Sequence, residues 1–202
     1  MANNFDLEEQ EQLDQLKHFW KSWGNLISIV AFIVLGALAG WNMYGYWKNN
    51  QAFQASMMLD VVKSSVFSGD ASRVDRVFLD IKEKYPKSIQ ATQAGFLVAK
   101  FNYDRGDLQA AKAALQSVID GGSDINQRFI ANLRFASLLL EEKKYDEALE
   151  KVSISFPADF KGLKSDRRAD LLLMQKNIKD AISDYLIAYQ NYSGNLDYRK
   201  II

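Results

Sequence analysis

The chain has 202 residues, of which 48% are hydrophobic and 25% are charged, a balance typical of a globular domain. It contains no cysteine, which excludes a disulfide scaffold, a thiolate metal site and a lipoprotein anchor, and its zero net charge gives no support for nucleic acid as a partner. With only two prolines and no long apolar–polar alternation, the chain is predicted to be all-α.

An acidic segment comes first. Residues 1–23 carry five acids against two bases, Lys17 and Lys21, whereas residues 48–202 carry 23 bases and 20 acids. The next segment, residues 24–47, contains no charged residue and would span about 36 Å as a helix, enough to cross a ~30 Å hydrocarbon core. We therefore predict a transmembrane helix over residues 24–47, embedded in a lipid bilayer.

The aromatic residues support this prediction. All four tryptophans lie at the ends of the apolar segment, two before it and two in its second half, as in the aromatic belts of membrane helices. A cleaved signal peptide is the main alternative, because Ala37-Leu38-Ala39 resembles a cleavage site. The long acidic start and the apolar run beyond that point favour an uncleaved anchor.

The orientation of the anchor rests on few charges. Lys17 and Lys21 precede the span and Lys48 follows it. This slight bias predicts a single-pass membrane protein with a cytoplasmic N-terminus and with the domain over residues 48–202 on the outer side of the membrane. Inside the span, Gly36-x-x-x-Gly40 matches a motif for close packing of membrane helices, and self-assembly through this small-residue face is one option.

A repeat of 33–37 residues follows the span. Turn signals occur at Gly69-Asp70, Gly106-Asp107, Lys143-Lys144-Tyr145 and Lys176-Asn177-Ile178. Ala99, Ala136 and Ala169 lie seven residues before their turns, and Ala111, Ala148 and Ala181 lie five residues after them. Val62 and Val74 take these places in the first unit, which is therefore degenerate. We expect small side chains where the two helices of a hairpin cross most closely.

This pattern resembles the tetratricopeptide repeat, a helix–turn–helix unit of 34 residues, over about residues 51–190. The predicted fold is thus a transmembrane helix followed by a tetratricopeptide-like stack of helical hairpins. An irregular helical bundle with chance spacing is the alternative.

The first helices of such hairpins line a concave surface. By their spacing, the residues expected to face it as a partner groove are Phe96, Lys100, Tyr103, Leu133, Ser137, Leu140, Asp170 and Leu173. Burial of any of them between repeats is the alternative. A clamp for a terminal carboxylate needs several cationic or amide groups, and Lys100 alone offers one in this set, so an apolar groove for an extended or helical peptide is favoured.

The sequence offers no catalytic chemistry. His18, beside the predicted span, is the only histidine, and no phosphate-binding glycine loop occurs. We therefore predict no enzyme activity, no catalytic residues, no cofactor and no metal site.

The whole layout resembles a known family, the YfgM-like ancillary subunits of the SecYEG translocon of Gram-negative bacteria. The matching features are the acidic start Asp6-Leu7-Glu8-Glu9-Gln10-Glu11-Gln12, His18-Phe19-Trp20 leading to Trp23-Gly24-Asn25, the pair Gly40-Trp41, and repeats that include Ala131-Asn132-Leu133-Arg134-Phe135-Ala136.

The resemblance implies a single-pass inner-membrane protein whose repeat domain, residues 48–202, is periplasmic. It also implies association with SecYEG and with a PpiD-type periplasmic folding factor. It implies a chaperone-like role toward exported client proteins as they leave the channel. A membrane-tethered scaffold or stress-response regulator without client binding is the alternative.

Overall fold

A computed structural model describes residues 7–122, 124–155 and 157–191 of the chain. These residues form eight α-helices and one short 3-10 helix, with no strand among them, which confirms the all-α prediction. The elements are α1 (Leu7–Ser68), α2 (Ala71–Lys84), α3 (Ile89–Asp104), α4 (Leu108–Gly121), α5 (Ile125–Glu141), α6 (Tyr145–Ser153), η1 (Ala158–Phe160), α7 (Lys161–Met174) and α8 (Ile178–Asn191). The ends of the predicted segments 1–23 and 48–202, residues 1–6 and 192–202, lie outside the described residues.

The chain divides into two compact units between Asn50 and Gln51, and α1 crosses this division. In the first unit, the large apolar side chains from Leu26 to Trp47 are exposed. Among the described helices, α1 alone is long and apolar enough to cross a membrane, and its apolar window buries none of its residues. A helix that is apolar all round and lacks protein neighbours is the form expected of a membrane anchor.

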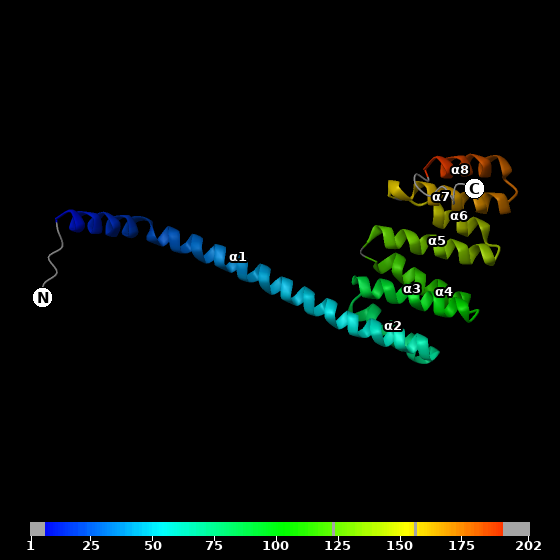
Figure 1. Ribbon diagram of the computed structural model, residues 1–202, viewed down its shortest axis with the longest axis horizontal. Coiled ribbons are helices and arrows are strands. Elements are labelled where there is room, and N and C mark those ends of the chain that lie inside the picture. The colour runs from blue at the N-terminus through cyan, green and yellow to red at the C-terminus, as the bar shows by residue number, and fades with distance from the viewer. Residues whose placement is uncertain (1–6, 123, 156, 192–202) are drawn as a thin grey trace. The chain divides into compact units, whose positions relative to one another are not determined.

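The second unit is a stack of four helical hairpins. They pair α3 with α4, α5 with α6, and α7 with α8, and consecutive hairpins from α3 onward lie side by side (Figure 1). The first hairpin pairs the end of α1 with α2, where Val62 and Val74 belong to one hydrophobic cluster. All four connections fall at the turns predicted from the repeat. The prediction of helical hairpins with a period of 33–37 residues is therefore confirmed.

One backbone conformation recurs in all four turns. Gly69 and Gly106 have φ values of 74° and 81°, and Lys143 and Lys176 have values of 62° and 63°. Each left-handed residue closes the preceding helix by a Schellman motif, in which the next N–H donates to a carbonyl five residues earlier, as Asp107 does to Asn102 at 2.9 Å. The glycines adopt this conformation freely, whereas the lysines carry a steric cost of about 1–2 kcal/mol.

The small residues predicted at the hairpin crossings are all buried. Each exposes 5% or less of its surface, the eight residues being Val62, Val74, Ala99, Ala111, Ala136, Ala148, Ala169 and Ala181. Their burial allows the two helices of each hairpin to approach closely. Gly95 adds a contact that the repeat pattern does not reveal, because a Cβ there would lie 2.4 Å from Val118 Cγ2 of α4.

Two hydrophobic clusters form the core of the stack. The first contains residues of α1, α2, α3 and α4, together with Ala131 and Leu138 of α5. The second contains residues of α5 and α6, together with Leu171 of α7. In the second cluster the Phe129 ring of α5 meets Phe160 edge to face, with centroids 4.5 Å apart. Helix α5 thus contributes to both clusters and connects the two halves of the stack.

A polar contact also joins the second and third hairpins. Lys112 Nζ of α4 lies 2.7 Å from both carboxylate oxygens of Glu142, and Lys144 Nζ lies 3.0 Å from one of them. The Lys112 and Glu142 side chains are only 8% and 14% exposed. Hydrogen bonds from Lys112 and then Lys144 lower the pKa of Glu142 below its ordinary value. The contact fixes the end of α5 against α4.

We predict that Gly95→Ala destabilises the protein, although alanine favours a helix by about 1 kcal/mol over glycine. The added methyl group would clash with Val118, and overpacking costs about 1–3 kcal/mol. Urea unfolding of the full chain in detergent, followed by far-UV circular dichroism, measures the change. Gln93→Ala on the exposed side of the same helix is the control and should change stability by less than about 0.5 kcal/mol.

A double variant isolates the cause. If the clash is responsible, Gly95→Ala combined with Val118→Ala should be more stable than the sum of the single changes predicts. Strict additivity of the two changes would contradict this explanation.

We also predict that the Lys112–Glu142 contact makes stability depend on pH. Because the folded pKa of Glu142 is lowered, its contribution is present above the unfolded pKa and is lost as the pH falls through the folded pKa. Glu142→Gln should therefore lower the urea midpoint at pH 7 and flatten the loss of stability below about pH 5. Glu150→Gln, at an exposed position of α6, is the matched control. Parallel pH profiles for Glu142→Gln and the unchanged protein would refute the assignment.

Candidate functional site

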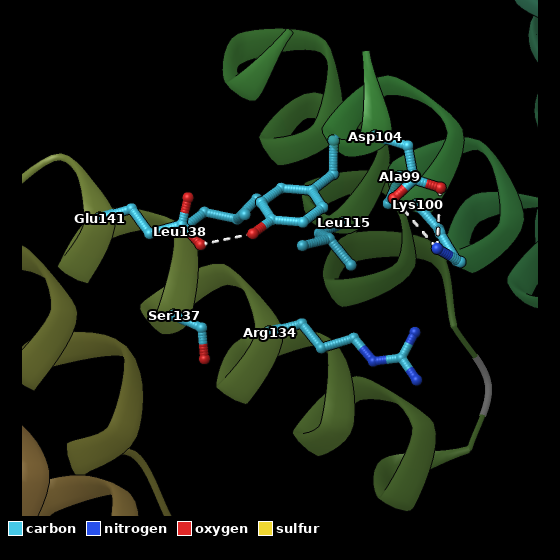
Figure 2. A pocket seen from close by; sticks show the side chains of 9 residues that line it. Ala99, Lys100, Asp104, Leu115, Arg134, Ser137, Leu138 and Glu141 are labelled. Atoms are coloured by element: carbon cyan, nitrogen blue, oxygen red, sulfur yellow. Dashed lines mark hydrogen bonds and ion pairs between the residues drawn. The ribbon is translucent and has the colours of Figure 1, made fainter. Parts of the chain in front are cut away.

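A hollow of the repeat unit lies between the first helices of the second and third hairpins. This α3–α5 groove has a volume of about 370 Å³ (Figure 2). Its lining comes from α3, α4 and α5 and consists of Ala99, Lys100, Tyr103, Asp104, Leu115, Arg134, Ser137, Leu138 and Glu141. Ala99, Leu115 and Leu138 are buried members of the first core cluster and form its apolar part.

Most of the polar groups at the groove are paired with one another. Lys100 Nζ lies 2.7 Å from Asp104 Oδ2 in an ion pair along α3. The Tyr103 hydroxyl donates a hydrogen bond of 2.8 Å to Glu141 Oε1, which links α3 to α5. This hydrogen bond and the nearby negative charge of Glu141 raise the pKa of Tyr103, because they oppose loss of the hydroxyl proton.

Arg134 is the remaining charged group of the groove. Its guanidinium carbon lies 4.7 Å from the centre of the Phe96 ring, in a cation–π contact between α5 and α3. In Figure 2 the Arg134 side chain extends along the groove away from Glu141. The contact with Phe96 holds the guanidinium in one place and does not use its N–H donors.

The predicted partner-groove residues lie at several separate places in the structure. Lys100, Tyr103 and Ser137 line the α3–α5 groove. Phe96 is partly buried against the first core cluster, where it supports Arg134. Leu173 is 45% exposed near the end of α7 and lines neither hollow described here.

The other predicted residues gather at a second, much smaller hollow between α5 and α7. Leu133, Leu140 and Asp170 line it, together with Ser137, and its volume is only about 20 Å³. Leu133 is 7% exposed and belongs to the second core cluster, as the alternative of burial between repeats anticipates. Asp170 accepts a hydrogen bond of 2.8 Å from the Tyr185 hydroxyl, so its carboxylate is already occupied. This hollow is too small for a peptide side chain.

The predicted partner groove did not include six of the residues that line this groove, which are Ala99, Asp104, Leu115, Arg134, Leu138 and Glu141. Arg134 and Glu141 are the charged residues among them on α5. They lie three residues before and four residues after Ser137, which places all three on one face of α5. The helical spacing around Ser137 therefore contained the signal. This spacing was overlooked because the repeat was recognised by its apolar and small positions, and these charged residues belong to neither group.

The predicted packing residues of the span, Gly36 and Gly40, lie in the exposed part of α1. A Cβ added at either position would meet no atom within 4 Å. Among the residues that the structure describes, none fills this surface, which is therefore open to a helix of another molecule.

Comparison with known proteins finds one family that includes both the span and the hairpins of this chain. The family model described as a tetratricopeptide repeat-like domain matches residues 17–202. Because the match includes the span as well as the hairpins, and the turns and buried alanines recur in step, the alternative of an irregular bundle is set aside.

The relatives carry one name. An ancillary SecYEG translocon subunit of Neisseria gonorrhoeae is 30% identical over 183 residues, which cover 89% of this chain and 86% of the relative. The proteins of the same name from Escherichia coli and Haemophilus influenzae are 25% identical over 178 residues (87% and 84% of the two chains) and 30% identical over 149 residues (72% and 71%). As the resemblance predicted, the chain belongs to the family of tetratricopeptide repeat-like proteins named ancillary SecYEG translocon subunits.

Proposed function

We propose that this protein is an ancillary subunit of the SecYEG export channel that binds newly exported chains in its α3–α5 groove. The observation that carries the proposal is the similarity to the ancillary subunits over nearly the whole chain, anchor and hairpins included. The role is that of a non-enzymatic scaffold that works through protein–protein contacts.

The anchor restricts where the groove can act. A helix of this length and apolarity holds the repeat unit at a membrane surface. In the proposed arrangement the N-terminus is cytoplasmic and the hairpins are periplasmic, which agrees with the lysines at the two ends of the span. The groove then lies on the side where exported chains emerge and where a PpiD-type folding factor is the expected partner.

The groove also has the chemistry for weak binding of unfolded segments. Its floor is apolar, its rim carries hydrogen-bonding groups, and it is open to solvent along two helices. An extended chain could place an apolar side chain over Leu115 and Leu138 while keeping its backbone hydrated. Such contacts would delay aggregation without requiring one particular sequence.

We predict that a photoreactive amino acid in place of exposed Lys100 forms crosslinks to an exported chain stalled in the channel, because the groove contacts such chains. The full-length protein is reconstituted with SecYEG, and radiolabelled products are identified by electrophoresis. The same amino acid in place of Ala113, which is exposed on α4 outside the groove, should give few such products. Crosslinks to channel subunits without any to the exported chain would instead favour a scaffold or regulator that binds no client.

We also propose that the Gly36–Gly40 face packs on a membrane helix of the channel. Changing both glycines to leucine should reduce co-purification of the channel about ten-fold, because the larger side chains keep the helices apart. Ala31→Leu adds bulk to the opposite side of α1 and should have little effect. Equal recovery of the channel with both variants would rule out this face, and loss of self-crosslinking alone would assign it to a second copy.

A further inference from the structure

The α3–α5 groove contains a cation that lacks a carboxylate partner. Among the side chains that the structure describes, no Asp or Glu forms an ion pair with Arg134. Its contact is with the ring of Phe96, and a ring contact leaves the five guanidinium N–H donors available. Arg134 is therefore held in position by Phe96, while its guanidinium N–H groups can still donate hydrogen bonds to a ligand.

Neither of the two acidic residues of the groove, Asp104 and Glu141, forms an ion pair with Arg134. Asp104 is held by Lys100, with N···O distances of 2.7 and 3.0 Å. Glu141 accepts from Tyr103, and Figure 2 shows its carboxylate at the end of the groove away from the Arg134 guanidinium. The end with Lys100, Asp104 and Arg134 carries one net positive charge, and the Glu141 end carries one net negative charge.

The apolar floor lies between these two ends. Leu115 and Leu138 are buried at 2% and 6% exposure, and the volume of about 370 Å³ accommodates apolar side chains of a bound segment. A ligand that fills the floor and places an acidic group at the Arg134 end would satisfy both features together.

Building on the proposed function, we propose that the groove prefers extended peptide segments in which an acidic side chain adjoins an apolar residue, with the carboxylate bound by Arg134. A side-chain carboxylate fits better than a terminal one. Capture of a terminus uses several convergent donors or unpaired backbone N–H groups, and the groove is formed by helix faces with a single uncommitted cation.

Peptide binding to the full-length protein in detergent tests the preference. The probe is a fluorescein-labelled peptide with a central Leu-Glu-Leu, blocked at both ends, and its match has a central Leu-Gln-Leu. We expect the acidic peptide to bind about five-fold more tightly at low salt, as one partly exposed ion pair allows. Arg134→Gln should remove this difference and leave the affinity for the Leu-Gln-Leu peptide unchanged.

Two further variants control for charge and position. Arg105→Gln removes another arginine that stacks on a phenylalanine, with its guanidinium carbon 5.1 Å from the centre of the Phe101 ring, outside the groove lining. It should retain the full preference, and Arg134→Lys, which keeps the charge, should retain part of it. Arg134 is exposed, so circular dichroism should show all variants folded.

The possible results separate this inference from the proposed function. Equal affinity of the unchanged protein for the two peptides, or a preference that survives in Arg134→Gln, overturns the inference while leaving client binding intact. Failure of both peptides to bind overturns the inference and client binding together. If a Leu-Gln-Leu peptide with a free carboxyl end gains affinity through Arg134 while the Leu-Glu-Leu peptide does not, the site binds chain ends and the stated preference is wrong.

Discussion

The close crossing of the two helices in every hairpin is the constraint on which the repeat unit depends. Alanine or valine occupies both sides of each crossing, and all eight positions are buried. A longer side chain there would separate the helices and displace the next hairpin as well, because protein interiors are close-packed and transmit strain. The left-handed turn residue sets the crossing by ending the first helix at a fixed distance from it. Four repetitions of this local arrangement produce the stack.

The groove is a consequence of how successive hairpins meet. Helix α5 packs on α4 and belongs to both core clusters, so the contacts of these clusters determine its position relative to α3. The ion pair of Lys112 with Glu142 fixes the end of α5, and Tyr103 bridges to the residue before it, Glu141. The open space between α3 and α5 is thereby maintained by contacts within the fold, and some of these contacts, such as that of Tyr103 with Glu141, are made by groove residues themselves. A ligand could bind there without paying for a rearrangement of the fold.

The hairpins were predictable from the sequence because turns and close crossings demand particular residue types at fixed spacing. The same reasoning placed Lys100, Tyr103 and Ser137 on the first helices, where they line the groove. It did not separate Leu133 from them, because burial between hairpins depends on the angle at which helices pack and not on position along one helix. Arg134 and Glu141 were missed because charged residues on a helix face are usually interpreted as solvent-exposed surface residues. The stacking on Phe96 and the bond to Tyr103 that distinguish them join residues 38 positions apart.

A groove that makes few directed contacts binds its ligand weakly. The membrane anchor offsets this weak affinity by raising the local concentration of the groove. On the proposed function, α1 confines the repeat unit to the membrane that holds the channel, so an emerging chain meets the groove at an effective concentration that approaches the millimolar range. Weak binding then suffices for frequent contact, and it allows rapid release, which a chain that must go on to fold requires. A tight and highly specific site would retain its ligand and block the next one. The internal pairing of Lys100 with Asp104 and of Tyr103 with Glu141 serves this requirement, because it leaves a ligand only the apolar floor and the donors of Arg134.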